Sequence, residues 1–220
     1  MNRSAAIPFV VLALALATLG SGGCAPQDIT PVIAQDVEIL RLFKVEGAVP
    51  PEKVREARAV AIVSRVEAAA VVGGSGGEGL VMKRLEHGWS SPAAVSAVSG
   101  TFGFQLGGRG QQLVLLFMTE ESIDKFITSG SYSLAQAVGT GGNASTGGAT
   151  AGQSDGVEPY SRSGGLFGSA AVGGVGFSVD EPRNRATYGV SGETARILSG
   201  RVTPPPGTYT LWAALDDLAK

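Results

Sequence analysis

Glycine is the feature of this sequence that most constrains its fold. The chain has 220 residues, of which 33 are glycine, and these stand largely beside apolar runs. Because glycine has no Cβ, it allows two backbones to approach closely, and inside a strand it marks tight packing or strong twist. Gly-rich strand segments recur near residues 72, 103 and 173. This recurrence suits a curved sheet or partial barrel.

The remaining patterns predict a single α+β domain, with a twisted antiparallel β-sheet or partial barrel and several short helices. The clearest helix signal is Thr119, an N-cap residue that precedes an acidic first turn and three apolar residues on one face. Strands are expected at 60–63, 68–72, 79–82, 95–106, 112–118 and 165–179. Further helices are expected at 36–42, 51–58, 134–138 and 211–218.

Residues 1–23 have the layout of an export signal. Arg3 precedes an apolar run of 15 residues, from Ala5 to Leu19, and small residues follow. The run is shorter than the roughly 20 residues that a membrane-spanning helix needs. We therefore expect this segment to be removed on export.

Cys24 is the only cysteine, which excludes an intramolecular disulfide. Its place after Gly23 resembles the end of a lipoprotein signal, although Ser21 stands where such signals usually have Leu. Lipidation of Cys24 explains this position, and a plain secretory signal is the alternative. With lipidation, we expect anchoring in the outer membrane, on the periplasmic side of the cell envelope. The chain then divides into a signal peptide (1–23), a tether (24–35) and a domain (36–220).

Short matches to catalytic motifs fail on their context. Gly74-Ser-Gly-Gly-Glu-Gly79 matches the dinucleotide-binding fingerprint, but no clear helix or correctly spaced acidic residue follows, so we interpret it as a tight turn between strands. Ser75 lies in a nucleophile-elbow pattern, yet the one histidine, His87, follows only 12 residues later. One histidine and one cysteine cannot make an ordinary transition-metal site by spacing. We expect no catalytic residue, no metal, no cofactor and no enzymatic activity.

The order of several short signatures is the most informative pattern in the mature chain. They are Val72–Leu80, Trp89-Ser-Ser-Pro92, Gly103–Gly108, Tyr160–Gly168, Asn184 and Tyr188-Gly189. This series resembles the SYLF domain family over residues 37–218. The resemblance implies lipid binding, directed at phosphoinositides in eukaryotic members, some of which associate with actin, while bacterial members are often lipoproteins. One departure is Gly164, where the family commonly has a lysine.

Charge leaves the binding partner open. The formal net charge of −2 gives no global field that would attract nucleic acid, so no nucleic-acid partner is expected. A phospholipid headgroup would need a local basic patch with an interfacial aromatic residue. The alternative is a solvated surface in which Arg162 makes a structural ion pair. The candidate lipid-binding residues are Lys83, Arg84, Trp89, Arg109 and Arg162.

Two functions are consistent with these features. The first is non-enzymatic phospholipid binding by a membrane-anchored periplasmic lipoprotein, through either headgroups or acyl chains. The second is a structural or protein-interaction role in the envelope, with a protein partner and with lipid serving only as the anchor. A headgroup binder should lose liposome binding in salt, whereas an acyl-chain binder should not.

Overall fold

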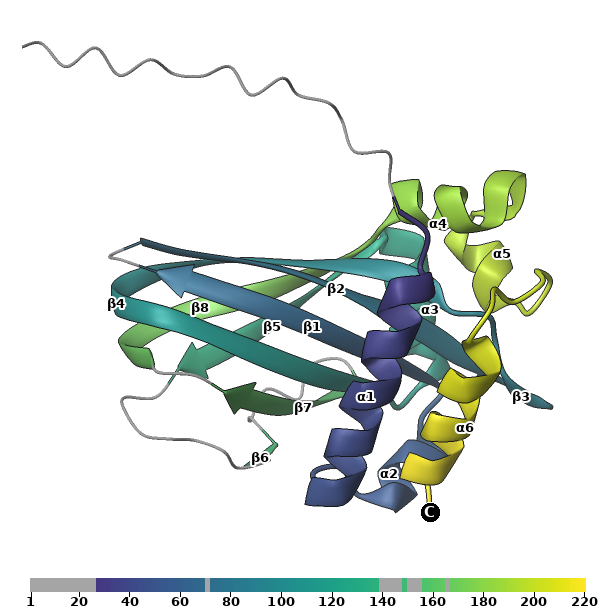
Figure 1. Ribbon diagram of the computed structural model, residues 1–220, viewed down its shortest axis with the longest axis horizontal. Coiled ribbons are helices and arrows are strands. Elements are labelled where there is room, and N and C mark those ends of the chain that lie inside the picture. Colours follow the sequence, from purple (N-terminus) through teal and green to yellow (C-terminus); the bar gives the residue numbers. More distant parts are fainter. Residues whose placement is uncertain (1–26, 70–71, 139–147, 150–155, 165–166) are drawn as a thin grey trace, which may run out of the picture.

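The computed structural model describes residues 27–69, 72–138, 148–149, 156–164 and 167–220. These residues form one eight-stranded antiparallel sheet and six α-helices (Figure 1), which confirms the predicted α+β class. The strands are β1 (Ala59–Ala69), β2 (Val72–Leu85), β3 (Gly88–Trp89), β4 (Ala93–Phe117), β5 (Ser131–Val138), β6 (Gly148–Ala149), β7 (Val157–Gly164) and β8 (Phe167–Val179). The helices are α1 (Thr30–Glu46), α2 (Pro51–Glu56), α3 (Glu120–Ser129), α4 (Glu181–Tyr188), α5 (Thr194–Leu198) and α6 (Thr208–Leu218), with a short 3-10 turn, η1 (Gly189–Ser191), after α4.

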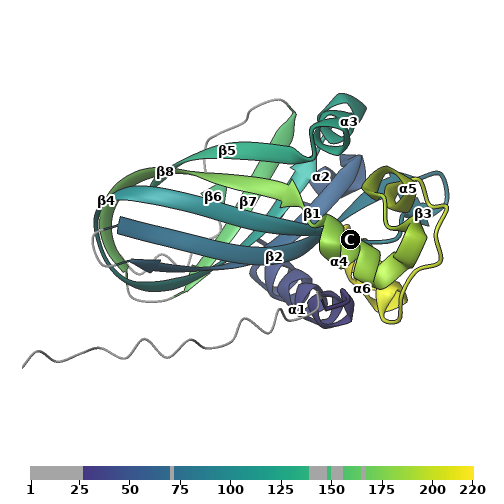
Figure 2. The ribbon, with the colours of Figure 1, turned by 90° about the horizontal axis from the view of Figure 1, so that it is seen from above.

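Strand β4 curls the sheet because it pairs with different strands along its length. Residues 93–102 pair with β2, and residues 107–117 pair with β1. The β1–β2 hairpin therefore lies between the two halves of β4. Strand β8 pairs with residues 95–107 of β4, and strand β7 pairs with residues 110–117. Strand β5 pairs in turn with β8. Figure 2 shows the resulting curled half-barrel, as the Gly-rich strands predict.

Two glycines of β2 show why this sheet needs them. A Cβ on Gly79 would overlap the carbonyl oxygen of Ile62, and a Cβ on Gly77 would lie 2.5 Å from the carbonyl oxygen of Ser64. Both oxygens belong to the backbone of β1, which cannot move aside in the way that a flexible side chain could. The interpretation of residues 74–79 as a tight turn is wrong, because all six residues lie within β2 and are paired with β1.

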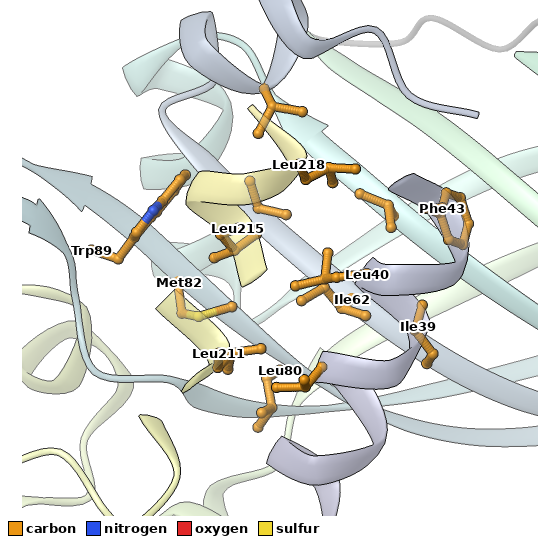
Figure 3. Close-up of a cluster of buried hydrophobic side chains, with 14 of the residues drawn as sticks. Ile39, Leu40, Phe43, Ile62, Leu80, Met82, Trp89, Leu211, Leu215 and Leu218 are labelled. Atoms are coloured by element: carbon orange, nitrogen blue, oxygen red, sulfur yellow. The ribbon is translucent and has the colours of Figure 1, made fainter. Parts of the chain in front are cut away.

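Alternate residues along the strands belong to two apolar clusters, which lie on opposite faces of the sheet. Helices α1 and α6 cover one face, where their side chains meet those of β1 and β2 (Figure 3). The labelled members are Ile39, Leu40, Phe43, Ile62, Leu80, Met82, Trp89, Leu211, Leu215 and Leu218. On the other face, α3 and α5 pack against residues of the opposite parity, such as Val63, Val81 and Leu115.

Helix α3 begins as the sequence predicts. The Oγ1 atom of Thr119 accepts a hydrogen bond from the backbone amide of Ser122 at 3.1 Å, which is the expected N-cap. Ile123 and Phe126 are buried, and the ring of Phe126 lies 5.8 Å from that of Phe117. Gly130 then ends the helix in the left-handed conformation, with φ of 66°.

Two elements differ from the sequence-based expectation. Helix α1 begins at Thr30 rather than Asp36, and Val32 and Ile33 are buried, so the folded domain includes part of the segment expected to be a tether. The predicted helix at 134–138 is wrong, because this segment belongs to β5 and pairs with β8. The edge of β8 offers this segment a pairing partner, and such tertiary pairing decides in favour of the strand.

Candidate functional site

The structure does not bring Lys83, Arg84 and Arg162 together at one site. Lys83 and Arg84 are consecutive in β2 and therefore point to opposite faces of the sheet. The Nζ atom of Lys83 lies 2.9 Å from a carboxylate oxygen of Glu120 and 3.0 Å from one of Asp124, both in α3. Partial burial lowers the pKa of Lys83, but the hydrogen bonds to these two carboxylates outweigh it, and the net pKa is raised.

Arg84 and Trp89 do lie together, but their contacts are internal. The Arg84 guanidinium lies 4.0 Å from the centroid of the Trp89 ring, and it donates to the carbonyl oxygens of Val54 and Ala57 at 2.8 and 2.9 Å. Burial lowers the pKa of this guanidinium. Trp89 is only 5% exposed, and its Nε1–H donates to Asp216 at 3.1 Å. This pair joins the sheet to α2 and α6.

Arg162 makes a structural ion pair, which is the alternative to a basic lipid-binding patch that the sequence leaves open. Its Nε lies 2.7 Å from a carboxylate oxygen of Glu46 in α1, and its Nη1 donates to Gln112 at 3.1 Å. Arg109 lies in β4, opposite Glu67 in the register with β1. Cys24 lies outside the described residues. A lipid-binding role for these residues stays a prediction.

The contacts of Arg84 lead to a first prediction. Changing Arg84 to lysine removes the guanidinium fork and its stacking on Trp89, and we expect the free energy of unfolding to fall by about 1 kcal/mol. Arg58, an exposed residue next to β1, provides the matched control, because its change to lysine should cost less than about 0.5 kcal/mol. Urea unfolding followed by circular dichroism measures both. Equal losses in the two variants would show that the contacts of Arg84 contribute nothing specific.

The family-like residues around 89–92 also have structural roles. The Oδ1 atom of Asn184, which is fully buried, accepts from the amide of Ala94 at 2.7 Å. The hydroxyl of Tyr188 donates to the carbonyl oxygen of Pro92 at 2.6 Å, and the Ser91 hydroxyl donates to that of Val202 at 3.1 Å. These bonds fasten α4 and the chain before α6 to the start of β4. These signature residues therefore stabilise the fold, and their hydrogen bonds do not form a binding surface.

A polar pocket of about 400 Å³ lies beside α4, on residues that the sequence did not single out as a site. The side chain of Arg183 pairs with Glu78 of β2, and its Nε lies 3.8 Å from a carboxylate oxygen of Asp180. Asp180 also accepts a hydrogen bond from Ser96 at 3.1 Å. Gln35 of α1 contributes a further side of the pocket. Two guanidiniums, those of Arg183 and the buried Arg65, therefore line the pocket together with the carboxylates of Glu78 and Asp180.

The first described residues of the chain lie close to the same helix. The backbone amide of Ile29 donates to the Oγ1 atom of Thr187 in α4 at 3.1 Å, and Ile29 is fully buried. Only four residues separate Ile29 from Cys24 in the sequence. Among the described residues, no group of His, Cys, Asp or Glu is arranged to hold a metal ion. No helix in that part of the chain has the length and apolar character needed to cross a membrane.

The fold and pocket define an α+β half-barrel domain with a mixed-charge surface pocket. The chain belongs to the Ysc84 family, whose model is described as "Las17-binding protein actin regulator" and matches residues 98–218. This membership confirms the SYLF resemblance. No solved structure matches the chain.

Several eukaryotic proteins are similar to this chain. It is 29% identical over 196 residues to LAS seventeen-binding protein 3 of Saccharomyces cerevisiae, covering 86% of this chain and 42% of that protein. It is 30% identical over 178 residues to SH3 domain-containing YSC84-like protein 1 of Xenopus laevis, covering 78% of this chain and 53% of that protein. The chain thus spans about half the length of these relatives or less.

Proposed function

We propose that this protein is a non-enzymatic, phospholipid-binding lipoprotein, anchored on the periplasmic side of the outer membrane through Cys24. The observation that carries the proposal is the position of the mixed-charge pocket. Arg183 of the pocket and Thr187, which holds Ile29, both lie on α4. A lipid on Cys24 would therefore keep the pocket near a membrane surface.

The chemistry of the pocket fits a zwitterionic headgroup that carries a phosphate and an ammonium group. The guanidinium of Arg183 would bind the phosphate oxygens, and the carboxylates of Glu78 and Asp180 would accept hydrogen bonds from the ammonium group. The existing pair between Arg183 and Glu78 is partly exposed, with side-chain exposures of 22% and 44%. Because exposed ion pairs contribute little, exchanging this pair for a headgroup costs little stability.

Co-sedimentation with liposomes tests this proposal. A chain beginning at Ala25 should bind phosphatidylethanolamine-containing liposomes without the anchor, and added salt should weaken the binding. Changing Arg183 to methionine should weaken binding about tenfold, because a charge-assisted hydrogen bond is lost. Arg41, an exposed residue of α1, is the matched control, since its change to methionine removes the same charge elsewhere. Equal binding by the two variants would exclude the pocket, and absence of binding to every lipid composition would reject the function.

A second candidate is protein binding, with lipid serving only as the anchor. The observation in its favour is an aromatic pair on α6, where Tyr209 is 72% exposed and its ring lies 5.1 Å from that of Trp212 in an edge-to-face arrangement. Exposed aromatic residues are enriched at the centres of protein interfaces. The yeast relative is named as a binder of LAS seventeen, which is also a protein-interaction role. Failure of all liposome binding would favour this candidate.

A further inference from the structure

We infer that the turn Gly189–Ser191 (η1), at the end of α4, is the surface through which this domain contacts the lipid bilayer. The inference rests on the proposed anchor at Cys24, and it specifies which end of the domain faces the membrane. Three observations lead to it: the short link between Cys24 and the folded domain, the exposure of Val190, and the distance of the exposed Val45 from the anchor.

The link to the anchor is short and fixed at its folded end. The amide of Ile29 is bonded to Thr187, one residue before the end of α4. Ile29 follows Cys24 by five positions, and a chain spans at most about 3.5 Å per residue. Lipid attached to Cys24 therefore holds Ile29, whose amide is bonded to Thr187, within about 17 Å of the membrane interface. The η1 turn directly follows the helix that carries Thr187.

Val190 is presented to solvent by a turn that packs closely on α4. Its side chain is fully exposed, at 101% of the reference value, which is the highest value among the exposed large apolar residues of the described chain. Gly189 has φ of 62°, and a Cβ on Gly192 would lie 2.9 Å from the Arg185 backbone, so both glycines are needed for this close return. Contact with acyl chains would remove the apolar surface of this valine from water, which is favourable, and it would break no contact within the fold.

The other end of the domain provides an internal comparison. Val45, at the end of α1, is also strongly exposed, at 85%. It lies 15 residues beyond Thr30, which corresponds to about 22 Å along a helix. Figure 1 shows α4 at the top, where the chain enters the domain, and the C-terminal end of α1 at the bottom. An anchor at Cys24 should therefore bring Val190 to the bilayer and keep Val45 away from it.

Site-specific fluorescence in proteoliposomes tests this orientation. The full lipidated chain has no other cysteine once Cys24 is acylated, so Val190→Cys and Val45→Cys each carry one free thiol for an environment-sensitive dye. Both positions are exposed, so neither variant should disturb folding, and circular dichroism verifies this. Liposomes with bromine-labelled acyl chains should quench and blue-shift the dye at position 190. The dye at position 45 should remain unquenched.

Three outcomes overturn the inference, and they separate it from the proposed function. Equal or stronger quenching at position 45 rejects this orientation, as does absence of quenching at position 190 in a protein that mass spectrometry shows to be acylated. Absence of acylation at Cys24 rejects the anchor itself, and the orientation with it. Liposome binding of the unanchored chain is measured separately, so loss of headgroup binding at Arg183 leaves the result at position 190 intact.

Discussion

Changing Gly79 to alanine is expected to lower the free energy of unfolding by at least about 3 kcal/mol, or to prevent folding altogether. The new Cβ would overlap the carbonyl oxygen of Ile62 and lie 2.8 Å from the Cα of Val63. These atoms belong to β1, which is paired with β2 on one side and β4 on the other, so it cannot shift without breaking the sheet. Urea unfolding followed by circular dichroism measures the loss.

Gly76, in the same strand, provides the matched control. A Cβ at this position would meet no atom within 4 Å, and the backbone does not need a positive φ. The change of Gly76 to alanine should therefore be neutral or slightly stabilising, because it restricts the unfolded chain. If the two variants lose the same stability, a general requirement for glycine in β2 explains the result, and close approach at Gly79 does not.

This contrast shows what the sequence could predict about the sheet. The density of glycine beside apolar runs correctly predicts a curled sheet. The positions at which glycine is required depend on the register between β1 and β2, which a run of glycines does not define. The six residues at 74–79 therefore suggested a turn, although they continue a strand. The β5 segment shows the same limit, since its partner β8 begins about 30 residues later in the chain.

The candidate site was less predictable, because its contacts join distant parts of the sequence. Arg183 and Glu78 are separated by 105 residues, and no local spacing indicates their pairing. The sequence shows Lys83 and Arg162 as cations but not their partners. Glu120 lies 37 residues from Lys83, and Glu46 lies 116 residues from Arg162. The preference of tryptophan for membrane interfaces predicts an interfacial Trp89, and the sequence does not indicate that its indole N–H is bonded to Asp216 of α6. Only the fold determines which charges remain available for a ligand.

Asp36 is a buried acid that should weaken the fold at neutral pH. Its side chain is fully buried in α1, and neither carboxylate oxygen has a hydrogen bond of standard geometry among the described residues. Burial raises the pKa of Asp36 well above its ordinary 3.8, the charge of Glu78 raises it further, and the Leu80 amide lowers it only in part. Changing Asp36 to asparagine should raise the free energy of unfolding at pH 7 by about 2 kcal/mol, because asparagine has no proton that the unfolded chain can release.

The same shift gives a pH dependence with a defined sign. Above pH 3.8 the unfolded chain releases the proton of Asp36 while the folded chain keeps it, so stability falls as pH rises towards the raised pKa of the folded state. The asparagine variant should lack this fall. Asp217, an exposed residue of α6, is the control, and its change to asparagine should leave the pH dependence unchanged. Urea unfolding between pH 4 and pH 8 measures the three proteins, and a parallel fall in all of them would contradict a role for Asp36.

Asp36 also connects stability with the proposed pocket. Glu78 lines the pocket, and its charge is one of the causes of the raised pKa of Asp36. A residue that costs stability is retained most readily where it serves a binding site. If Asp36 contributes to binding in the pocket, the asparagine variant should be more stable and yet bind liposomes differently. If its binding is unchanged, the buried acid affects only the fold and has no part in the pocket.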